Sequence, residues 1–277
     1  MKIENITTDE ERAFYGSRGD TFTNCVFAGK ADGESALKES RDVTVKNCRF
    51  DLRYPLWHNE VCRLDTCILT ENCRAALWYT SEVSAVNTRF AGVKVLRECK
   101  HITLEDCDIV SPECGWFCRD VAIEKSRIEG EYFLFHASQI TARELEFRGK
   151  YSFQYCENVI LDNCTLDTKD AFWHAKNVTV RNSVIRGEYL GWYSEGLTLI
   201  NCRIEGTQPL CYCKKLTLVD CTMTNCDLSF EYSDVNATVT GKVDSIKNPL
   251  AGHIVCDGVG ELIRDEHARG DCAVTVR

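Results

Sequence analysis

A repeat of 19 residues constrains this 277-residue chain more than any other feature. Six segments share one template, in which two apolar residues flank a Thr-like residue and an Asn or Asp precedes a Cys or Ser. These segments are Val43–Phe50, Ile102–Ile109, Val159–Leu166, Val178–Ile185, Leu197–Ile204 and Leu216–Met223. The small residue of the template recurs, with Leu145 as the one misfit, at Cys107, Ser126, Leu145, Cys164, Ser183, Cys202, Cys221 and Thr240. Upstream, with small insertions, the column continues through Cys25, Cys48, Cys67 and Thr88.

This period predicts an all-β fold, a single-stranded parallel β-helix (solenoid) of about eleven coils of 19 residues. A unit this short, without helical periodicity, buries its apolar face only by stacking on its neighbours. Stacking places paired strands about 4.8 Å apart. The two apolar residues of the template then point inward and the Thr between them outward. The Asn or Asp suits a tight turn, and the small residue fits inside the corner.

The ends of the chain depart from the template. We therefore expect one β-helix domain over residues 1–277, with an N-terminal cap at 1–20, repeat coils at 21–240 and a C-terminal cap at 241–277. Caps of this kind cover the terminal strand edges that a solenoid would otherwise expose.

A second segment repeats nine residues after each small residue and is rich in aromatic residues. All five tryptophans share one column, namely Trp57, Trp78, Trp116, Trp173 and Trp192. The next position along the chain holds Tyr, His, Phe or Glu. On a third strand these two columns would face opposite sides. Because small residues such as Ala76 and Ala171 flank the tryptophans, we expect the Trp column to point inward and the neighbouring column outward.

Composition excludes several classes of protein. The net charge of −9 disfavours nucleic acid as a partner, since phosphate binding requires a basic face. No apolar stretch reaches the length of a transmembrane helix, and the first residues do not resemble a signal peptide, so we expect no membrane partner and a cytoplasmic location. The 18 cysteines, with no CxxC pair, are then expected to be reduced and buried. No cofactor-binding motif is present, and we expect no cofactor.

Several strings in the chain carry a family resemblance: Ala31–Lys38, Leu52–His58, Arg74–Tyr79, Ser111–Phe117 and Lys169–His174. Through them nearly the whole chain resembles the right-handed parallel β-helix proteins of the pectin-lyase-like superfamily. It is more closely similar to an uncharacterised bacterial family of β-helix proteins with a domain of unknown function. The resemblance implies a right-handed coil and carries no assigned activity, because β-helices serve lyases, hydrolases, epimerases and inert stalks alike.

The first hypothesis for function is a binding or assembly module that uses the aromatic and histidine column as an exposed surface. An apolar strip of this length exceeds what monomers usually expose. A homodimer formed by pairing two such strips is one expectation, and an oligosaccharide or small-molecule ligand is another. A flank covered by the chain's own termini is the structural alternative. The surface residues are His58, Tyr79, Glu98, His136, Tyr155, His174, Tyr193 and Tyr212.

The second hypothesis is an intracellular carbohydrate-active enzyme of the lyase, hydrolase or epimerase type. Its acid and base residues would lie on the flank of the first strand, where Glu105 and Glu124 are expected one coil apart, near 5 Å by strand spacing. Arg143 beside them would neutralise a uronate, and Asp162 continues the column. Asp170, with His136 and His174, forms a second candidate site. The alternative is a row of solvated charges that pair with one another.

Four residues near the C-terminus are weak candidates for zinc ligands. They are His253, Cys256, His267 and Cys272. Their spacing matches no established zinc motif, so we expect no metal site there.

Overall fold

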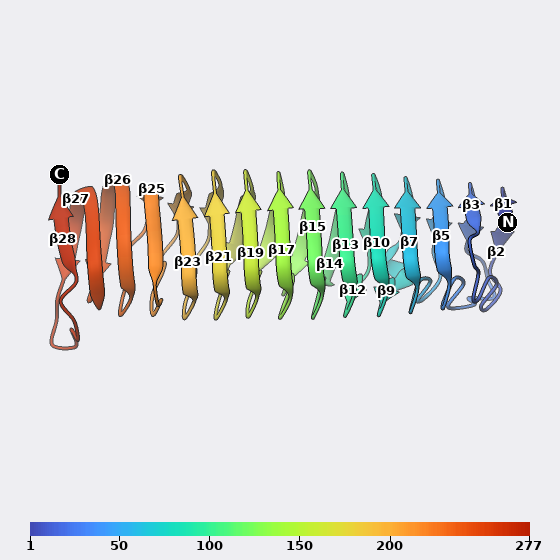
Figure 1. Cartoon of the computed structure of the whole chain (residues 1–277), viewed down its shortest axis with the longest axis horizontal. Helices are drawn as coiled ribbons and strands as arrows, with labels where there is room; N and C mark the ends of the chain where they lie inside the picture. Colours follow the sequence, from blue (N-terminus) through green and yellow to red (C-terminus); the bar gives the residue numbers. More distant parts are fainter. The chain divides into compact units, whose positions relative to one another are not determined.

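The computed structural model describes residues 1–277. The chain forms two compact units, Met1–Ile140 and Thr141–Arg277. Both units are parallel β-solenoids. No α-helix is present, and the one helical segment is the short 3-10 helix η1 (Glu71–Cys73). Within each unit, strands on the same side of successive coils lie side by side and pair in parallel (Figure 1). The all-β parallel solenoid predicted from the repeat is confirmed.

In the first unit, two series of parallel strands form two sides of each coil. The first side consists of β1 (Lys2–Glu4), β3 (Thr21–Thr23), β5 (Arg41–Lys46), β7 (Glu60–Asp65), β10 (Ser81–Val86), β13 (Lys100–Glu105) and β15 (Arg119–Glu124). The second side consists of β2 (Thr7–Thr8), β4 (Val26–Phe27), β6 (Arg49–Phe50), β8 (Ile68–Leu69), β11 (Arg89–Ala91), β14 (Asp108–Glu113) and β16 (Arg127–Glu131). On the third side only β9 (Leu77–Trp78) and β12 (Leu96–Arg97) are strands. The residues of β17 (Ser138–Arg143) fall on both sides of the division into units.

The second unit repeats this plan and ends in longer strands. Its first side consists of β19 (Glu157–Asp162), β21 (Lys176–Arg181), β23 (Glu195–Ile200), β25 (Leu216–Thr224), β26 (Asp234–Lys247), β27 (Ala251–Ile263) and β28 (Ala273–Val276). Its second side consists of β18 (Glu146–Lys150), β20 (Thr165–Lys169), β22 (Val184–Arg186) and β24 (Arg203–Glu205). Val159, Val178 and Leu197 are successive register partners, so an offset of 19 residues places side chains directly above one another.

The strands of the first side alternate as the template predicts. Val178, Val180, Leu197 and Leu199 are fully buried. Thr179 and Thr198 lie between them and face outward. Burial of these aliphatic columns supplies the main favourable free energy of the fold, at about 25 cal/mol for each Å² of apolar surface removed from water.

The corner between the first two sides explains the Asn–Cys pair of the template. Asn163 and Asn182 have left-handed backbone conformations, with φ of 54° and 52°. The small residue that follows is buried and hydrogen-bonds between coils. The backbone N–H of Cys164 donates to the hydroxyl of Ser183, 2.9 Å away, and that hydroxyl donates to the carbonyl of Arg181 at 2.6 Å. Cys, Ser or Thr therefore satisfies an inward-pointing N–H that an alkyl side chain would leave unpaired.

The chain makes about fourteen turns rather than the eleven predicted. Both regions expected to be caps contain paired strands. At the start, β1 pairs with β3, and at the end β26, β27 and β28 continue the parallel pairing. The register also shifts between Leu218 and Cys221, so that Val239 rather than Thr240 lies opposite Cys221. Val239 is buried and Thr240 is exposed, which makes the assignment of Thr240 to the small column wrong.

The third side of most coils is not the strand that the aromatic columns were expected to form. In the coil of Asp170 to His174, every second residue is left-handed, with φ of 56° at Asp170, 59° at Phe172 and 54° at His174. The backbone N–H groups of Asp170 and His174 donate to Glu188 and Trp192 of the following coil at 2.9 and 3.0 Å. On such a backbone, buried and exposed side chains do not alternate as they do along a β-strand. Phe172 and Ala175 are buried, whereas the adjacent pair Trp173 and His174 both reach solvent.

Replacing Ser183 with Ala should lower the free energy of unfolding by about 1–3 kcal/mol, because the buried Cys164 N–H loses its acceptor. The matched control is Ser183→Cys, which keeps an acceptor of the kind used elsewhere in the column, as at Cys48, whose sulfur accepts the N–H of Cys25. Denaturant unfolding of both variants measures the difference. Equal losses for Ala and Cys would contradict the role given to the side chain.

All 18 cysteines are unpaired and buried, as expected from the sequence. Burial raises the pKa of the Cys62 thiol to about 12 and that of Cys213 to about 11, so these thiols remain protonated near neutral pH. The native chain should therefore react slowly with Ellman's reagent at about pH 8, whereas all thiols should react after unfolding in guanidinium. Rapid labelling of several thiols in the native state would contradict this burial.

Candidate recognition surface

The tryptophan column lies on the outside of the third side, half-buried, so the expectation that it points inward is wrong. Each indole N–H reaches a backbone carbonyl in the following coil. The indole nitrogens of Trp173 and Trp192 donate to the carbonyls of Tyr189 and Gln208 at 2.8 and 2.7 Å. In the second unit these two rings stack with centroids 5.5 Å apart and an angle of 5° between their planes. The tryptophans thus connect successive coils by hydrogen bonds and ring stacking along the outer surface.

Polar residues also occupy the tryptophan column, and they replace contacts that the indole rings make in other coils. Gln154 makes the bond of the missing indole, donating from its side-chain amide to the carbonyl of Asp170 at 3.0 Å. In the first unit, the guanidinium of Arg97 lies over the rings of Trp78 and Trp116, 5.2 and 5.4 Å from their centroids. These cation–π contacts continue the stack without an aromatic ring.

The neighbouring column in the second unit forms a continuous stack of four rings. We call it the outer ladder, and its members are Tyr155, His174, Tyr193 and Tyr212. Successive centroids are 4.9, 5.0 and 4.8 Å apart, and the planes differ by 12°, 7° and 13°. Tyr155 and Tyr193 are 40% and 46% exposed. The members are left-handed residues, with φ of 54° to 60°, and this conformation turns each ring out of the coil.

The first unit has a different arrangement in the same column. His58 stacks on Tyr79 at 4.9 Å, and Phe117 stacks on His136 at 5.5 Å. Between these pairs lies Glu98, whose carboxylate is 3.6 Å from the guanidinium of Arg97. The structure thus stacks four of the predicted surface residues as one ladder in the second unit. In the first unit, His58 stacks on Tyr79, His136 stacks on Phe117, and Glu98 forms an ion pair.

Stacking determines what the outer ladder presents to a partner. His174 and Tyr193 each have an aromatic neighbour on both ring faces. The surface that remains accessible is therefore mainly the ring edge, which carries the imidazole nitrogens of His and the hydroxyl of Tyr at its tip. A platform for stacking a sugar ring would need an exposed aromatic face. The ladder instead offers polar edges at intervals of about one coil.

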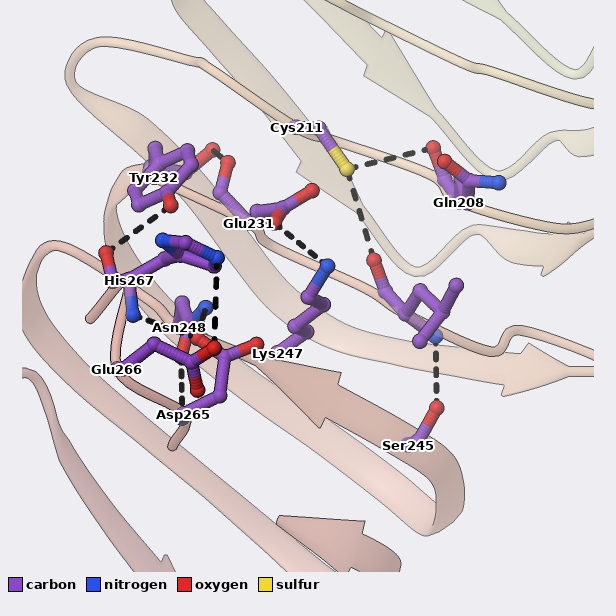
Figure 2. Close-up of polar contacts among 12 residues, drawn as sticks. Gln208, Cys211, Glu231, Tyr232, Ser245, Lys247, Asn248, Asp265, Glu266 and His267 are labelled. Carbon is purple, nitrogen blue, oxygen red and sulfur yellow. Dashed lines mark hydrogen bonds and ion pairs between the residues drawn. The ribbon is translucent and has the colours of Figure 1, made fainter. Parts of the chain in front are cut away.

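A group of polar contacts lies beside Tyr212, the last residue of the outer ladder. Figure 2 shows its members Glu231, Tyr232, Lys247 and His267. The ring of Tyr212 lies 5.7 Å from that of Tyr232, and burial together with the nearby Glu231 raises the pKa of Tyr212. Glu231 occupies the next position of the ladder column and binds the ammonium of Lys247 at 2.9 Å. The hydroxyl of Tyr232 donates to the carbonyl of His267 at 3.0 Å. This hydrogen bond holds the segment around His267 against Tyr232, next to the end of the ladder.

The acidic residues of the second hypothesis lie on the first side of the coils. Glu105 and Glu124 are register partners on β13 and β15, and both are half-exposed. In the second unit, Arg143 forms an ion pair with Glu144 at 3.1 Å, and Asp162 accepts a hydrogen bond from the side chain of Asn182 at 2.8 Å.

Asp170 is the one catalytic candidate that is buried. Burial raises the pKa of its carboxyl, although the nearby Lys169 acts in the opposite direction. Lys169 is itself paired with Glu188 at 3.0 Å. Asp170 shares its coil with His174, but the two side chains differ in surroundings, because His174 is exposed within the outer ladder.

The zinc candidates are dispersed between core and surface. Cys256 and Cys272 are buried, whereas His253 and His267 are exposed. His253 hydrogen-bonds Thr275 at 2.9 Å through its ring nitrogen. No group of three or more His, Cys, Asp or Glu residues is arranged to hold a metal ion. The structure also contains no helix with the length and apolar character needed to cross a membrane.

The fold and the surface define the class of this protein, a parallel β-solenoid with a stacked aromatic ladder on the outer side of its coils. The chain belongs to the family described as "Protein of unknown function (DUF3737)", which matches residues 1–277. This confirms the resemblance to a domain-of-unknown-function family of β-helix proteins. A search of curated proteins finds no match to the chain.

Several solved structures are similar to this chain. The surface adhesin PfbA of Streptococcus pneumoniae is 10% identical, with a TM-score of 0.35 over 98% of this chain and 71% of that chain. A tailspike protein mutant of E. coli bacteriophage HK620, in complex with a pentasaccharide, is 8% identical, with a TM-score of 0.47 over 94% of this chain and 72% of that chain. The catalytic domain of a GH87 alpha-1,3-glucanase, in complex with tetrasaccharides, is 9% identical, with a TM-score of 0.33 over 99% and 63%.

Replacing Lys247 with Met should destabilise the second unit at neutral pH, because Glu231, whose side chain is 14% exposed, would lose its partner. The hydrogen bond to Glu231 raises the pKa of Lys247 above its ordinary value of 10.5. The stabilisation is therefore fully present below 10.5 and is lost as pH rises through the higher, folded-state value. Denaturant unfolding of the native chain and the variant at neutral and strongly alkaline pH checks this. A difference that persists unchanged at alkaline pH would contradict it.

Proposed function

We propose that this chain is a binding and assembly module that recognises its partner through the outer ladder of the second unit. The observation that supports this is the continuous stack of Tyr155, His174, Tyr193 and Tyr212 on the outside of the coils. On the first side of the coils, the comparable outward columns carry mainly Thr, Asn and charged residues. Exposed aromatic edges combine an apolar body with a polar tip, which suits an interface that is dry at its centre and hydrogen-bonded at its rim.

A carbohydrate-active enzyme is the alternative, and one observation favours it. Glu105 and Glu124 are register partners on adjacent strands. The strand spacing therefore puts these two residues about 5 Å apart, near the separation of about 5–5.5 Å used by retaining glycosidases. Catalytic carboxylates, however, act in sites that exclude water. Both side chains here are half-exposed on the outer face of a sheet, so we prefer the binding module.

Replacing Tyr193 with Ala tests the proposal, because it removes the ring between His174 and Tyr212. We expect binding to weaken about tenfold or more, as for a central aromatic residue of an interface. Two readouts cover the two kinds of partner: sedimentation velocity for self-association, and an array of neutral and uronate-containing oligosaccharides.

The controls are Tyr193→Phe, which keeps the stacked ring, and Tyr15→Ala, which removes an equally exposed tyrosine outside the ladder. Circular dichroism verifies that each variant is folded. If the native chain neither self-associates nor binds an oligosaccharide, or if Tyr193→Ala binds as well as Tyr15→Ala, the outer ladder is not a recognition surface.

A further inference from the structure

A row of alternating charges runs beside the outer ladder. Each member lies two positions after a ladder residue, and in chain order they are Glu157, Lys176, Glu195 and Lys214. They are register partners on successive coils, at the starts of β19, β21 and β23 and just before β25. Glu157 and Lys176 form an ion pair at 3.6 Å, and their side chains are 53% and 57% exposed. A partner that covers the ladder would therefore also meet these charges.

Reversing the order of the row exchanges the sign of the charge at every position. Read in the opposite direction, the order Glu, Lys, Glu, Lys becomes Lys, Glu, Lys, Glu, so every charge meets its opposite. The midpoint of this reversal lies between the coils of His174 and Tyr193. At the same midpoint, the reversed ladder places His174 opposite Tyr193 and Tyr155 opposite Tyr212. An imidazole nitrogen then faces a phenol hydroxyl, which is a complementary hydrogen-bonding pair.

From this complementarity we infer that the outer ladder binds the outer ladder of a second copy of the chain, in antiparallel orientation. The two-fold axis passes between the coils of His174 and Tyr193. Glu157 then faces the partner's Lys214, and Lys176 faces the partner's Glu195. The same patch serves both copies, as a two-fold symmetric interface requires. This inference rests on the proposed function and names the partner of that surface.

The spacing of the ladder favours a second copy over a polysaccharide. The rings are 4.8 to 5.0 Å apart because each belongs to one coil, and every other copy has the same interval. Two such ladders therefore remain in step along their whole length. A sugar chain recognised by stacking would need ring faces, and both faces of His174 and Tyr193 are already occupied.

The charges select the register of the pairing rather than its strength. Exposed ion pairs contribute little to the free energy of association, and Glu157 and Lys176 are already paired within the chain. Like charges placed opposite each other are more costly and exclude wrong alignments. If the two-fold axis passed through the coil of Lys176, Glu157 would face the partner's Glu195. Lys176 would then face the partner's Lys176. The aromatic edges supply the apolar contact, and only the alignment with its axis between the coils of His174 and Tyr193 pairs all four charges of the row with opposite charges.

The test uses two charge variants of the full chain. The first reverses all four charges: Glu157→Lys, Lys176→Glu, Glu195→Lys and Lys214→Glu. It keeps the alternation within each chain, so it should fold and dimerise like the native chain. The second variant, Glu157→Lys with Glu195→Lys, makes the row uniformly positive. Its dimer should dissociate about tenfold or more readily, as measured by sedimentation equilibrium.

Mixing the native chain with the four-charge variant is the decisive measurement. Each protein should form its own dimer, but a mixed dimer would bring like charges together at every contact of the row. Glu157 of the native chain would face a second carboxylate, introduced by Lys214→Glu, and Lys176 would face a second ammonium group, introduced by Glu195→Lys. Native mass spectrometry after subunit exchange should therefore show mixed dimers well below the statistical proportion. Mixed dimers in statistical proportion would overturn the inferred pairing.

A monomeric native chain would also overturn the inference, and so would a Tyr193→Ala chain that still dimerises. These failures are distinguishable from failure of the proposed function. If Tyr193→Ala abolishes binding to the oligosaccharide array while the native chain remains monomeric, the ladder is a recognition surface with a different partner. If neither readout responds to Tyr193→Ala, the proposed function fails together with the inference.

Discussion

Hydrogen bonding between successive coils is the interaction on which the rest of this structure depends. The backbone of each coil donates to and accepts from the coils beside it, so residues 19 apart become neighbours in space, as at Val178 and Leu197. Every column then has a physical consequence that a single coil would not have. An aliphatic column becomes a core and an aromatic column becomes a stack. An asparagine column becomes a series of hydrogen bonds between side-chain amides, such as that from Asn201 to Asn182 at 2.9 Å.

At the corners of the coils, one backbone N–H group lacks a strand partner, and the small column of Cys, Ser and Thr residues supplies an acceptor for it. A corner turns one backbone N–H toward the interior, where no strand accepts it. Ser183 and Ser126 accept such a bond directly, from Cys164 and Cys107. A thiol is small enough for the corner and polarisable enough to accept and donate weakly, so the high cysteine count requires neither disulfides nor metals for its explanation.

Sequence reasoning predicted the parts of the fold that follow from stacking alone. The period, the inward apolar columns, the outward threonines and the left-handed asparagines needed only the repeat and strand alternation. The third side was predicted wrongly because left-handed residues such as Phe172 and His174 abolish that alternation, and tyrosine and phenylalanine are not residues that signal a left-handed backbone. The outer ladder residues were identified, although the stacking of four of them into one ladder required coordinates. Lys38 and Arg97, which occupy the tryptophan column in other coils, were the available signal that this column reaches solvent.

The left-handed backbone of the third side also explains why the chain has an unusual outer surface. A β-strand alternates its side chains, so at most every second residue faces outward. Here Trp173 and His174 are adjacent and both reach the surface, which doubles the aromatic density on this side of the coil. The inner of the two columns is anchored by indole N–H bonds to backbone carbonyls, and this fixes the rings of the outer column at the interval of the coils. A surface whose side chains are immobilised before a partner arrives loses less conformational entropy on binding than one built from flexible residues. Under the proposed function, the tryptophan column, whose own indole N–H groups are bonded within the chain, would lower the entropic cost of binding at the outer ladder.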